Sequence, residues 1–128
     1  MDPKQLRYAK THEWARLDGD VCVVGLTQFA VDQLTDIIYI ELPKVGKTVH
    51  AEGAFGEIES VKSVNDLYSP VDGEVVEVNT QLANDPSLIS KDPYGKGWLI
   101  KVKVAAGATL DDLLTHEQYQ EQLASEEH

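Results

Sequence analysis

The sequence contains little cysteine, few basic residues and no long apolar run, and each shortage excludes a class of protein. Cys22 is the only cysteine, so the chain cannot form the internal disulfide framework of small secreted domains. Lys and Arg number 11 against 22 Asp and Glu, and the net charge of -11 disfavours binding to nucleic acids or anionic membranes. No stretch approaches the roughly 18 apolar residues of a membrane span, and the first residues do not resemble a secretory signal. We therefore expect a cytoplasmic protein without nucleic-acid or membrane partners.

What is present is the composition of an ordinary folded domain. Hydrophobic residues make up 42% of the 128 positions and charged residues 26%, which is enough to bury one core of moderate size. A second domain has no room, so we expect residues 1–128 to form a single domain and see no reason to expect more than a monomer. The acidic balance favours protein partners with basic surfaces, and maintenance of solubility is the alternative explanation.

Short apolar runs separated by turn-forming residues fill the middle of the chain and predict a mainly β fold. Compact β-branched runs predict strands at Val21–Leu26 and at residues 37–42, and residues 99–104 alternate between apolar residues and lysine. The pattern PxxGxxV begins at Pro43 and recurs 27 residues later at Pro70. If the recurrence is not a coincidence, two similar β units lie on either side of the intervening segment.

Two segments have helical periodicity. Residues 27–35 begin with a candidate N-cap, Thr27, and carry apolar residues four positions apart, which predicts a short helix. After Gly107 the apolar residues follow helical spacing behind two capping patterns, which start at Thr109 and Thr115. We expect one or two amphipathic helices at the C-terminal end, packed on the sheets.

Lys62 lies between the two PxxGxxV units, in a run over residues 55–70 that predicts a β-hairpin with this lysine at its tip. A lysine amine in water is protonated at neutral pH, and Glu57, Glu59 and Asp66 would favour the cation further if they lie close in space, so a Schiff-base role is a poor fit. Acylation by a dedicated ligase fits better, because a modified lysine forms a long tether whose distal group performs chemistry that side chains cannot. The alternative is an ordinary solvated lysine.

The residues around Lys62 resemble the lipoylation region of the H proteins of the glycine cleavage system. The similarity covers residues 56–79 and is joined, in order, by residues 12–14, 24–27, 36–43 and 92–98. Thr35 departs from the pattern, which has glycine there, and this affects the predicted helix end rather than the function. Biotin carrier domains flank their lysine with methionines, whereas Val61 and Ser63 flank Lys62, and lipoyl domains of 2-oxo acid dehydrogenases usually place aspartate before the lysine.

The resemblance implies a fold and a function. The fold would be a barrel-sandwich hybrid of the lipoyl/biotinyl-carrier type, with a short helix in the N-terminal third and helices at the C-terminus. Lipoate would be attached covalently to Lys62 by a lipoate ligase or lipoyl transferase. The lipoyl-carrier domain, spanning residues 1–128 and not itself an enzyme, would shuttle an aminomethyl group from glycine decarboxylase to the tetrahydrofolate-dependent aminomethyltransferase. Dihydrolipoyl dehydrogenase would then reoxidise the dithiol of the lipoyl group. These reactions would belong to glycine catabolism and one-carbon metabolism.

The family is also thought to dock the loaded arm in a cleft, which needs acceptors for a cationic amine. Glu13, Thr11 and Asp66 are the candidates on this chain, because carboxylates and hydroxyls accept hydrogen bonds from such a group. Each of them could instead be an ordinary surface residue, and Asp66 could simply stabilise the hairpin turn.

Three other functions are the alternatives to a glycine cleavage carrier. The nearest alternative is an H-like protein that relays lipoyl groups to other lipoate-dependent enzymes. A small enzyme using Lys62 or Cys22 and an unmodified interaction module are further alternatives, but the sequence has no catalytic triad and no histidine spacing typical of a metal site. We expect Cys22 to be a buried, inert thiol, and Trp14 and Trp98 to be core aromatics.

Overall fold

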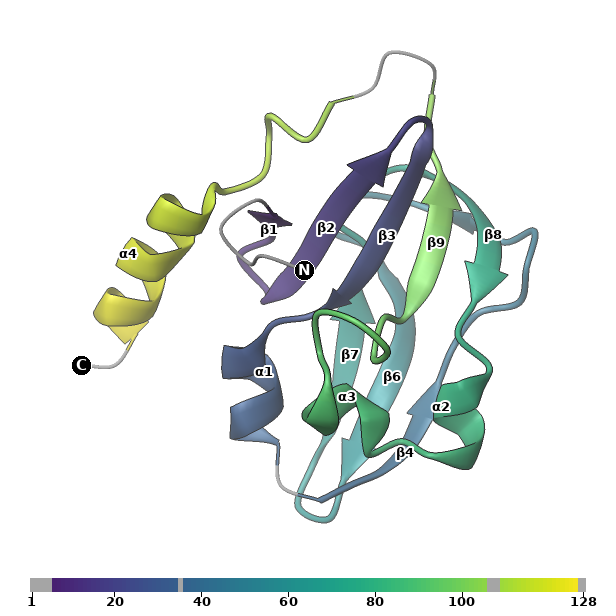
Figure 1. The fold of residues 1–128 in the computed structure, drawn as a ribbon, viewed down its shortest axis with the longest axis vertical. Coiled ribbons are helices and arrows are strands. Elements are labelled where there is room, and N and C mark those ends of the chain that lie inside the picture. The colour runs from purple at the N-terminus through teal and green to yellow at the C-terminus, as the bar shows by residue number, and fades with distance from the viewer. Residues whose placement is uncertain (1–5, 35, 106–108, 127–128) are drawn as a thin grey trace.

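The computed structural model describes residues 6–34, 36–105 and 109–126. Two antiparallel sheets form the body of the molecule (Figure 1). The first sheet has the order β1-β2-β3-β9-β8-β5, with strands Arg7–Tyr8, Glu13–Asp18, Val21–Leu26, Ile100–Lys103, Gly73–Val78 and Thr48–Val49. The second sheet has the order β4-β6-β7, with strands Ile37–Glu41, Ala54–Ser60 and Val64–Tyr68. The helices are α1 at Gln28–Gln33, α2 at Gln81–Asn84, α3 at Leu88–Lys91 and α4 at His116–Glu126.

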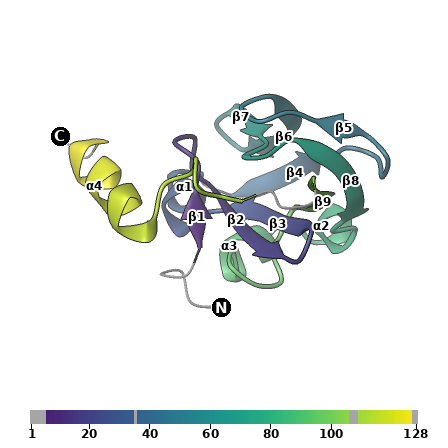
Figure 2. The same cartoon turned by 90° about the horizontal axis from the view of Figure 1, so that it is seen from above.

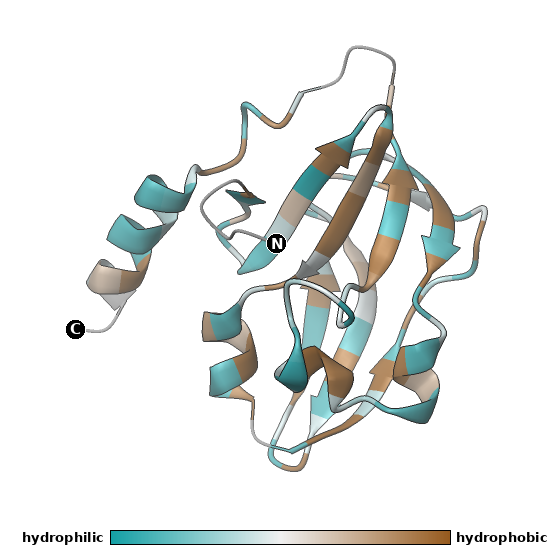
Figure 3. Cartoon of the chain, in the orientation of Figure 1, coloured by the Kyte–Doolittle hydropathy of each residue, from teal (hydrophilic) through white to brown (hydrophobic). Residues whose placement is uncertain are grey.

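The main core contains side chains from both sheets. Seen from above, β8 and β5 of the first sheet lie on the same side of the molecule as β6 and β7 of the second (Figure 2). The hydropathy colouring shows β3 as mostly apolar and α4 as mostly hydrophilic (Figure 3). Packing of apolar side chains from both sheets against one another removes apolar area from water and supplies most of the driving force for this fold. The core side chains, each no more than 6% exposed, include Val24, Val75, Ile100 and Val102 from the first sheet and Ile40, Ile58 and Leu67 from the second. The mainly β prediction and the predicted strand positions are confirmed.

The predicted short helix is confirmed as α1. Thr27 is its N-cap, with extended backbone angles and a side-chain oxygen that accepts a hydrogen bond from the Ala30 N–H. The helix ends with Leu34 as its C-cap, and Thr35, the position that departs from the family pattern, lies outside the described residues.

Only one of the two predicted C-terminal capping patterns starts a helix. Thr115 and Gln118 form a reciprocal capping box at the start of α4, with hydrogen bonds of 2.9 and 3.2 Å. The segment after Thr109 instead forms a turn, and Leu114 exchanges backbone hydrogen bonds of 2.8 Å with Tyr8. That extended pairing uses backbone groups that a helix would need, so the C-terminal end has one of the one or two expected helices and the Thr109 pattern does not start a second.

The two PxxGxxV units pair with each other but do not share a local structure. Gly46 has a φ of 96° and lies in a turn, whereas Gly73 begins β8, where an added Cβ would lie 2.2 Å from the Lys103 carbonyl oxygen. Val49 is buried and Val76 is exposed. The recurrence is therefore not a structural repeat at the level of single residues.

In the described parts of the chain, no helix is long and apolar enough to cross a membrane.

Candidate functional site

Lys62 lies at the tip of the hairpin formed by β6 and β7, as the sequence predicts. The Ser60 N–H donates to the Ser63 carbonyl oxygen at 2.8 Å, which leaves Val61 and Lys62 as the connecting loop. Below the tip, the Ser60 and Ser63 hydroxyls are 3.2 Å apart, and the Asn65 amide donates to the Ser63 hydroxyl at 3.1 Å. These contacts hold the base of the loop while the Lys62 side chain is exposed.

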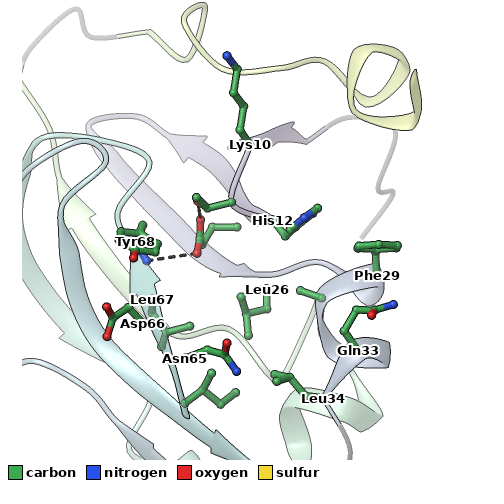
Figure 4. A pocket seen from close by; sticks show the side chains of 14 residues that line it. Lys10, His12, Leu26, Phe29, Gln33, Leu34, Asn65, Asp66, Leu67 and Tyr68 are labelled. Atoms are coloured by element: carbon green, nitrogen blue, oxygen red, sulfur yellow. Dashed lines mark hydrogen bonds between the residues drawn. The ribbon is translucent and has the colours of Figure 1, made fainter. Parts of the chain in front are cut away.

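A cleft of about 470 Å³ opens between α1 and β7, with the start of β2 at its polar end (Figure 4). We call it the arm cleft. Its walls are mostly apolar, and β7, which forms one of them, begins two residues after Lys62. A flexible group attached to Lys62 could therefore follow this strand towards the polar end. The apolar lining residues are Leu26, Phe29, Ala30, Leu34, Ile58 and Leu67.

Glu13 is a buried ionisable group of the arm cleft. It is the first residue of β2 and only 1% exposed. Its carboxylate accepts hydrogen bonds from the Thr11 hydroxyl and, at 3.2 Å, from the Tyr68 backbone N–H. Burial raises the pKa of Glu13 to about 7, although both hydrogen bonds act in the opposite direction. Near neutral pH this carboxyl can therefore be either charged or neutral, and a cation placed beside it would favour the charged form.

The turn between β1 and β2 brings Thr11 to Glu13. His12 has a φ of 78°, a left-handed conformation that reverses the chain, and its N–H donates to the Ala9 carbonyl oxygen at 3.0 Å. The Ala9 N–H in turn donates to the Glu13 carbonyl oxygen at 2.8 Å, so a second hydrogen bond closes the turn. This turn places the Thr11 hydroxyl beside the Glu13 carboxylate, and His12 between them also lines the cleft.

All three predicted cleft residues line the arm cleft, but they do not lie in it in the same way. Thr11 and Glu13 form its polar end. Asp66 is on β7, and Figure 4 shows its carboxylate on the side of that strand opposite to Asn65. Asp66 pairs across the sheet with Glu57, which faces away from the core. Its carboxylate therefore lies away from the polar end that Thr11 and Glu13 form.

Sequence reasoning missed two groups of the arm cleft. Asn65 lines it from the same face of β7 as the buried Leu67. Counting alternate positions from Leu67 along the strand could have found it. The Tyr68 backbone N–H, which binds Glu13, carries no side-chain signal and becomes visible only in the structure.

Cys22, which suggested a possible enzyme, and Trp14 both lie in the interior of the protein. Cys22 is fully buried, and burial raises the pKa of its thiol to about 12, so it is protonated at neutral pH and a poor nucleophile. Trp14 is 1% exposed, and its indole N–H donates to the Pro93 carbonyl oxygen at 2.9 Å. Within the described residues, no group of three or more His, Cys, Asp or Glu side chains could hold a metal ion.

Two packed antiparallel sheets that present one lysine on a tight hairpin define a carrier domain of the lipoyl and biotinyl type. Comparison with known proteins narrows the class. The family model described as Glycine cleavage H-protein matches residues 6–126, and the chain belongs to that family.

Relatives and a solved structure agree with this placement. A glycine cleavage system H protein of Carboxydothermus hydrogenoformans is 49% identical over 97% of this chain and 95% of its own. One from Bacteroides fragilis is 51% identical over 91% of this chain and 93% of its own. A crystal structure of a glycine cleavage system H protein from Mycobacterium marinum matches with a TM-score of 0.87 and 40% identity, covering 96% of this chain and 99% of that one. This likeness supports the barrel-sandwich fold of lipoyl carriers.

Proposed function

We propose that a lipoyl group is attached to Lys62 and that the chain works as a carrier rather than as an enzyme. Membership of the glycine cleavage H-protein family supports a lipoyl-carrier role in the glycine cleavage system. The observation that carries the attachment site is the position of Lys62, exposed at the tip of a hairpin whose base is fixed by hydrogen bonds. Such an amine is accessible to a modifying enzyme and, once modified, to several partners in turn. Residues 1–128 would act as one carrier domain.

The arm cleft fits the group. A lipoyl arm has an apolar stem, and a cargo with an amine would add a positive charge at its end. The cleft provides apolar walls along β7 and α1 and a buried carboxylate with a hydroxyl at its polar end. When bound, the lipoyl group supplies a disulfide that accepts the aminomethyl unit and a dithiol that is later reoxidised.

The residues of the cleft would each contribute one step to holding the cargo. Glu13 ionises as the cation approaches, because pairing with a positive charge lowers the pKa that burial has raised. Thr11 donates to Glu13 and so fixes the orientation of the carboxylate. Asp66, on the same strand that forms a wall of the cleft, adds a negative charge that attracts the cation. The apolar walls exclude the water that would otherwise release the cargo.

Glycine decarboxylase, the tetrahydrofolate-dependent aminomethyltransferase and dihydrolipoyl dehydrogenase are the proposed partners, with a lipoate ligase or lipoyl transferase for the modification. Support comes from the outer face of the three-stranded sheet, where Glu41 pairs with Glu57 and Glu57 with Asp66. Like charges directly opposite each other are unfavourable within a sheet, so a basic partner surface would relieve them. We propose that the carrier is a cytoplasmic monomer that meets each enzyme briefly.

Exchange of the glycine carboxyl group tests the carrier role. The lipoylated protein is mixed with glycine decarboxylase, bicarbonate and carboxyl-labelled glycine, and transfer of label to bicarbonate is measured. We expect exchange with the wild type and with Lys96→Arg, which alters another exposed lysine, and none with Lys62→Arg. A lipoylated wild type without exchange would rule out the glycine cleavage role and favour the relay of lipoyl groups to other enzymes.

The lifetime of the aminomethyl-loaded protein tests the arm cleft separately. Glu13→Ala should be lipoylated as well as the wild type but should lose the cargo to water faster, since the buried acceptor is gone. Glu74→Ala, which removes an exposed carboxylate from β8, is the matched control. An unchanged lifetime in Glu13→Ala would remove this residue from the cargo site.

A further inference from the structure

Tyr119 extends from the C-terminal helix α4 to the two elements that bound the arm cleft. Its hydroxyl oxygen lies 2.8 Å from Nδ1 of His12 and 2.7 Å from Oγ1 of Thr27. The side chain is 2% exposed, and its ring stacks on Tyr8 with centroids 4.5 Å apart and an interplanar angle of 4°. We call Tyr119 together with His12 and Thr27 the Tyr119 bridge.

The two partners of Tyr119 lie side by side where the polar end of the cleft meets the start of α1, and the Thr27 N–H donates to the His12 carbonyl oxygen at 3.0 Å. His12 lines the cleft directly before Glu13, in the turn that places Thr11. Thr27 is the N-cap of α1, and its Oγ1 also accepts the Ala30 N–H at 3.3 Å. Since α1 carries apolar residues of one wall, the Tyr119 hydroxyl adds a side-chain connection to the backbone hydrogen bond that already joins the start of this helix to His12.

A second contact from α4 fixes the same turn. The Gln122 side-chain amide donates to the Lys10 carbonyl oxygen at 3.0 Å, so α4 contacts the turn on both sides of Thr11. The beginning of α4 is itself anchored, because Leu114 pairs with Tyr8 through backbone hydrogen bonds. Most of the helix surface is hydrophilic (Figure 3), and its apolar contacts come from Tyr119 and Leu123, which pack against a buried cluster that includes Tyr8.

The bridge can exist in either tautomer of His12. With Nδ1 unprotonated, Tyr119 donates to His12 and accepts from the Thr27 hydroxyl. With Nδ1 protonated, Tyr119 accepts from His12 and donates to Thr27. The hydrogen bonds of Tyr119 to His12 and Thr27 are therefore compatible with either tautomer of His12.

We propose that Tyr119 is a positioning residue whose hydroxyl holds the β1–β2 turn against the start of α1, and so keeps the polar end of the arm cleft narrow and shielded from water. The C-terminal helix then controls how well the cleft protects a loaded arm. This consequence rests on the proposed carrier function, whereas the effect on the cleft itself does not.

Tyr119→Phe removes the hydroxyl and keeps the ring that stacks on Tyr8. In the unmodified protein, we expect the Glu13 titration, followed by the NMR shift of its labelled carboxyl carbon, to move from about 7 towards lower pH as water enters. Amide exchange at Ala30, whose N–H binds Thr27, should rise by roughly fivefold, as expected for the loss of one buried hydrogen bond. Tyr39→Phe, which removes a hydroxyl from a 54% exposed tyrosine on β4, should change neither readout.

The loaded protein gives a second readout. Tyr119→Phe should be lipoylated normally but should lose its aminomethyl cargo several times faster than the wild type. Gln122→Ala, which removes a partly exposed contact and does not endanger folding, should shift the Glu13 titration in the same direction by a smaller amount. It serves as the test if Tyr119→Phe does not fold.

A lower melting temperature with an unchanged Glu13 titration and unchanged Ala30 exchange would make Tyr119 an ordinary packing residue and overturn the proposal. If the titration and exchange shift as expected but the wild type itself does not protect the cargo, the positioning role stands and the cleft function is refuted. The two failures are therefore distinguishable.

Discussion

Replacing Glu13 by glutamine changes one buried ionisable group and leaves the size of the side chain nearly unchanged. The glutamine oxygen can still accept the Tyr68 N–H, and its amide can donate to the Thr11 hydroxyl. The free energy of unfolding should therefore differ between the two proteins mainly through the titration of Glu13. Because this residue is only 1% exposed, solvent screening does not weaken the effect much.

The sign and size follow from the pKa of Glu13, which burial raises from 4.5 to about 7. The folded protein holds this proton more tightly than the unfolded chain, so the protonated carboxyl contributes stability that is fully present below about pH 4.5. That contribution is lost as the pH rises through about 7, where the buried carboxyl must ionise. At 1.36 kcal/mol per pKa unit, the loss amounts to about 3 kcal/mol.

Urea unfolding of both proteins, repeated at several pH values between about 4 and 8, measures the difference. We expect Glu13→Gln to gain stability relative to the wild type by about 3 kcal/mol over this range, with most of the gain between the two pKa values. Glu74→Gln, which removes an exposed carboxylate from β8 with no carboxylate directly opposite it, corrects for the general effect of losing one negative charge. A difference between wild type and Glu13→Gln that does not depend on pH would refute the burial argument.

Three further predictions concern the packing that surrounds the site. Gly25→Ala should destabilise the protein by about 1 to 3 kcal/mol in urea unfolding, because the added Cβ would lie 2.4 Å from the Trp14 ring; no loss would mean that the ring can move aside. Thr115→Ala should lower the melting temperature through the loss of about 1 kcal/mol of helix capping, whereas Thr115→Ser, which keeps the hydroxyl, should not. Cys22 should react with a thiol reagent only at the rate of unfolding, and rapid labelling of the native protein would contradict its burial.

Features encoded by neighbouring residues could be predicted from the sequence. The hairpin under Lys62, the N-cap at Thr27 and the capping box at Thr115 each depend on residues within a few positions of one another. Their hydrogen bonds form locally, so the side chains at those positions identify the structure. The fold class followed from the alternation of short strands and from the resemblance to a family.

Features that depend on distant contacts could not be predicted in the same way. The turn after Thr109 forms instead of a helix because Leu114 pairs with Tyr8, far away in the sequence. The hydroxyl of Tyr119 meets His12 across 107 positions, and nothing in the surrounding helix sequence indicates that contact. Tertiary packing of this kind overrides local propensity.

The attachment of a lipoyl group at Lys62 is the central claim, and the intact mass of the protein tests it most directly. The chain is expressed with lipoate and an active ligase, weighed, and digested so that any adduct can be assigned to a peptide. We predict one lipoyl adduct on the peptide that contains Lys62, the same adduct in Lys96→Arg, and none in Lys62→Arg. An unmodified chain, a biotin adduct, or a lipoyl group on another lysine would contradict the account.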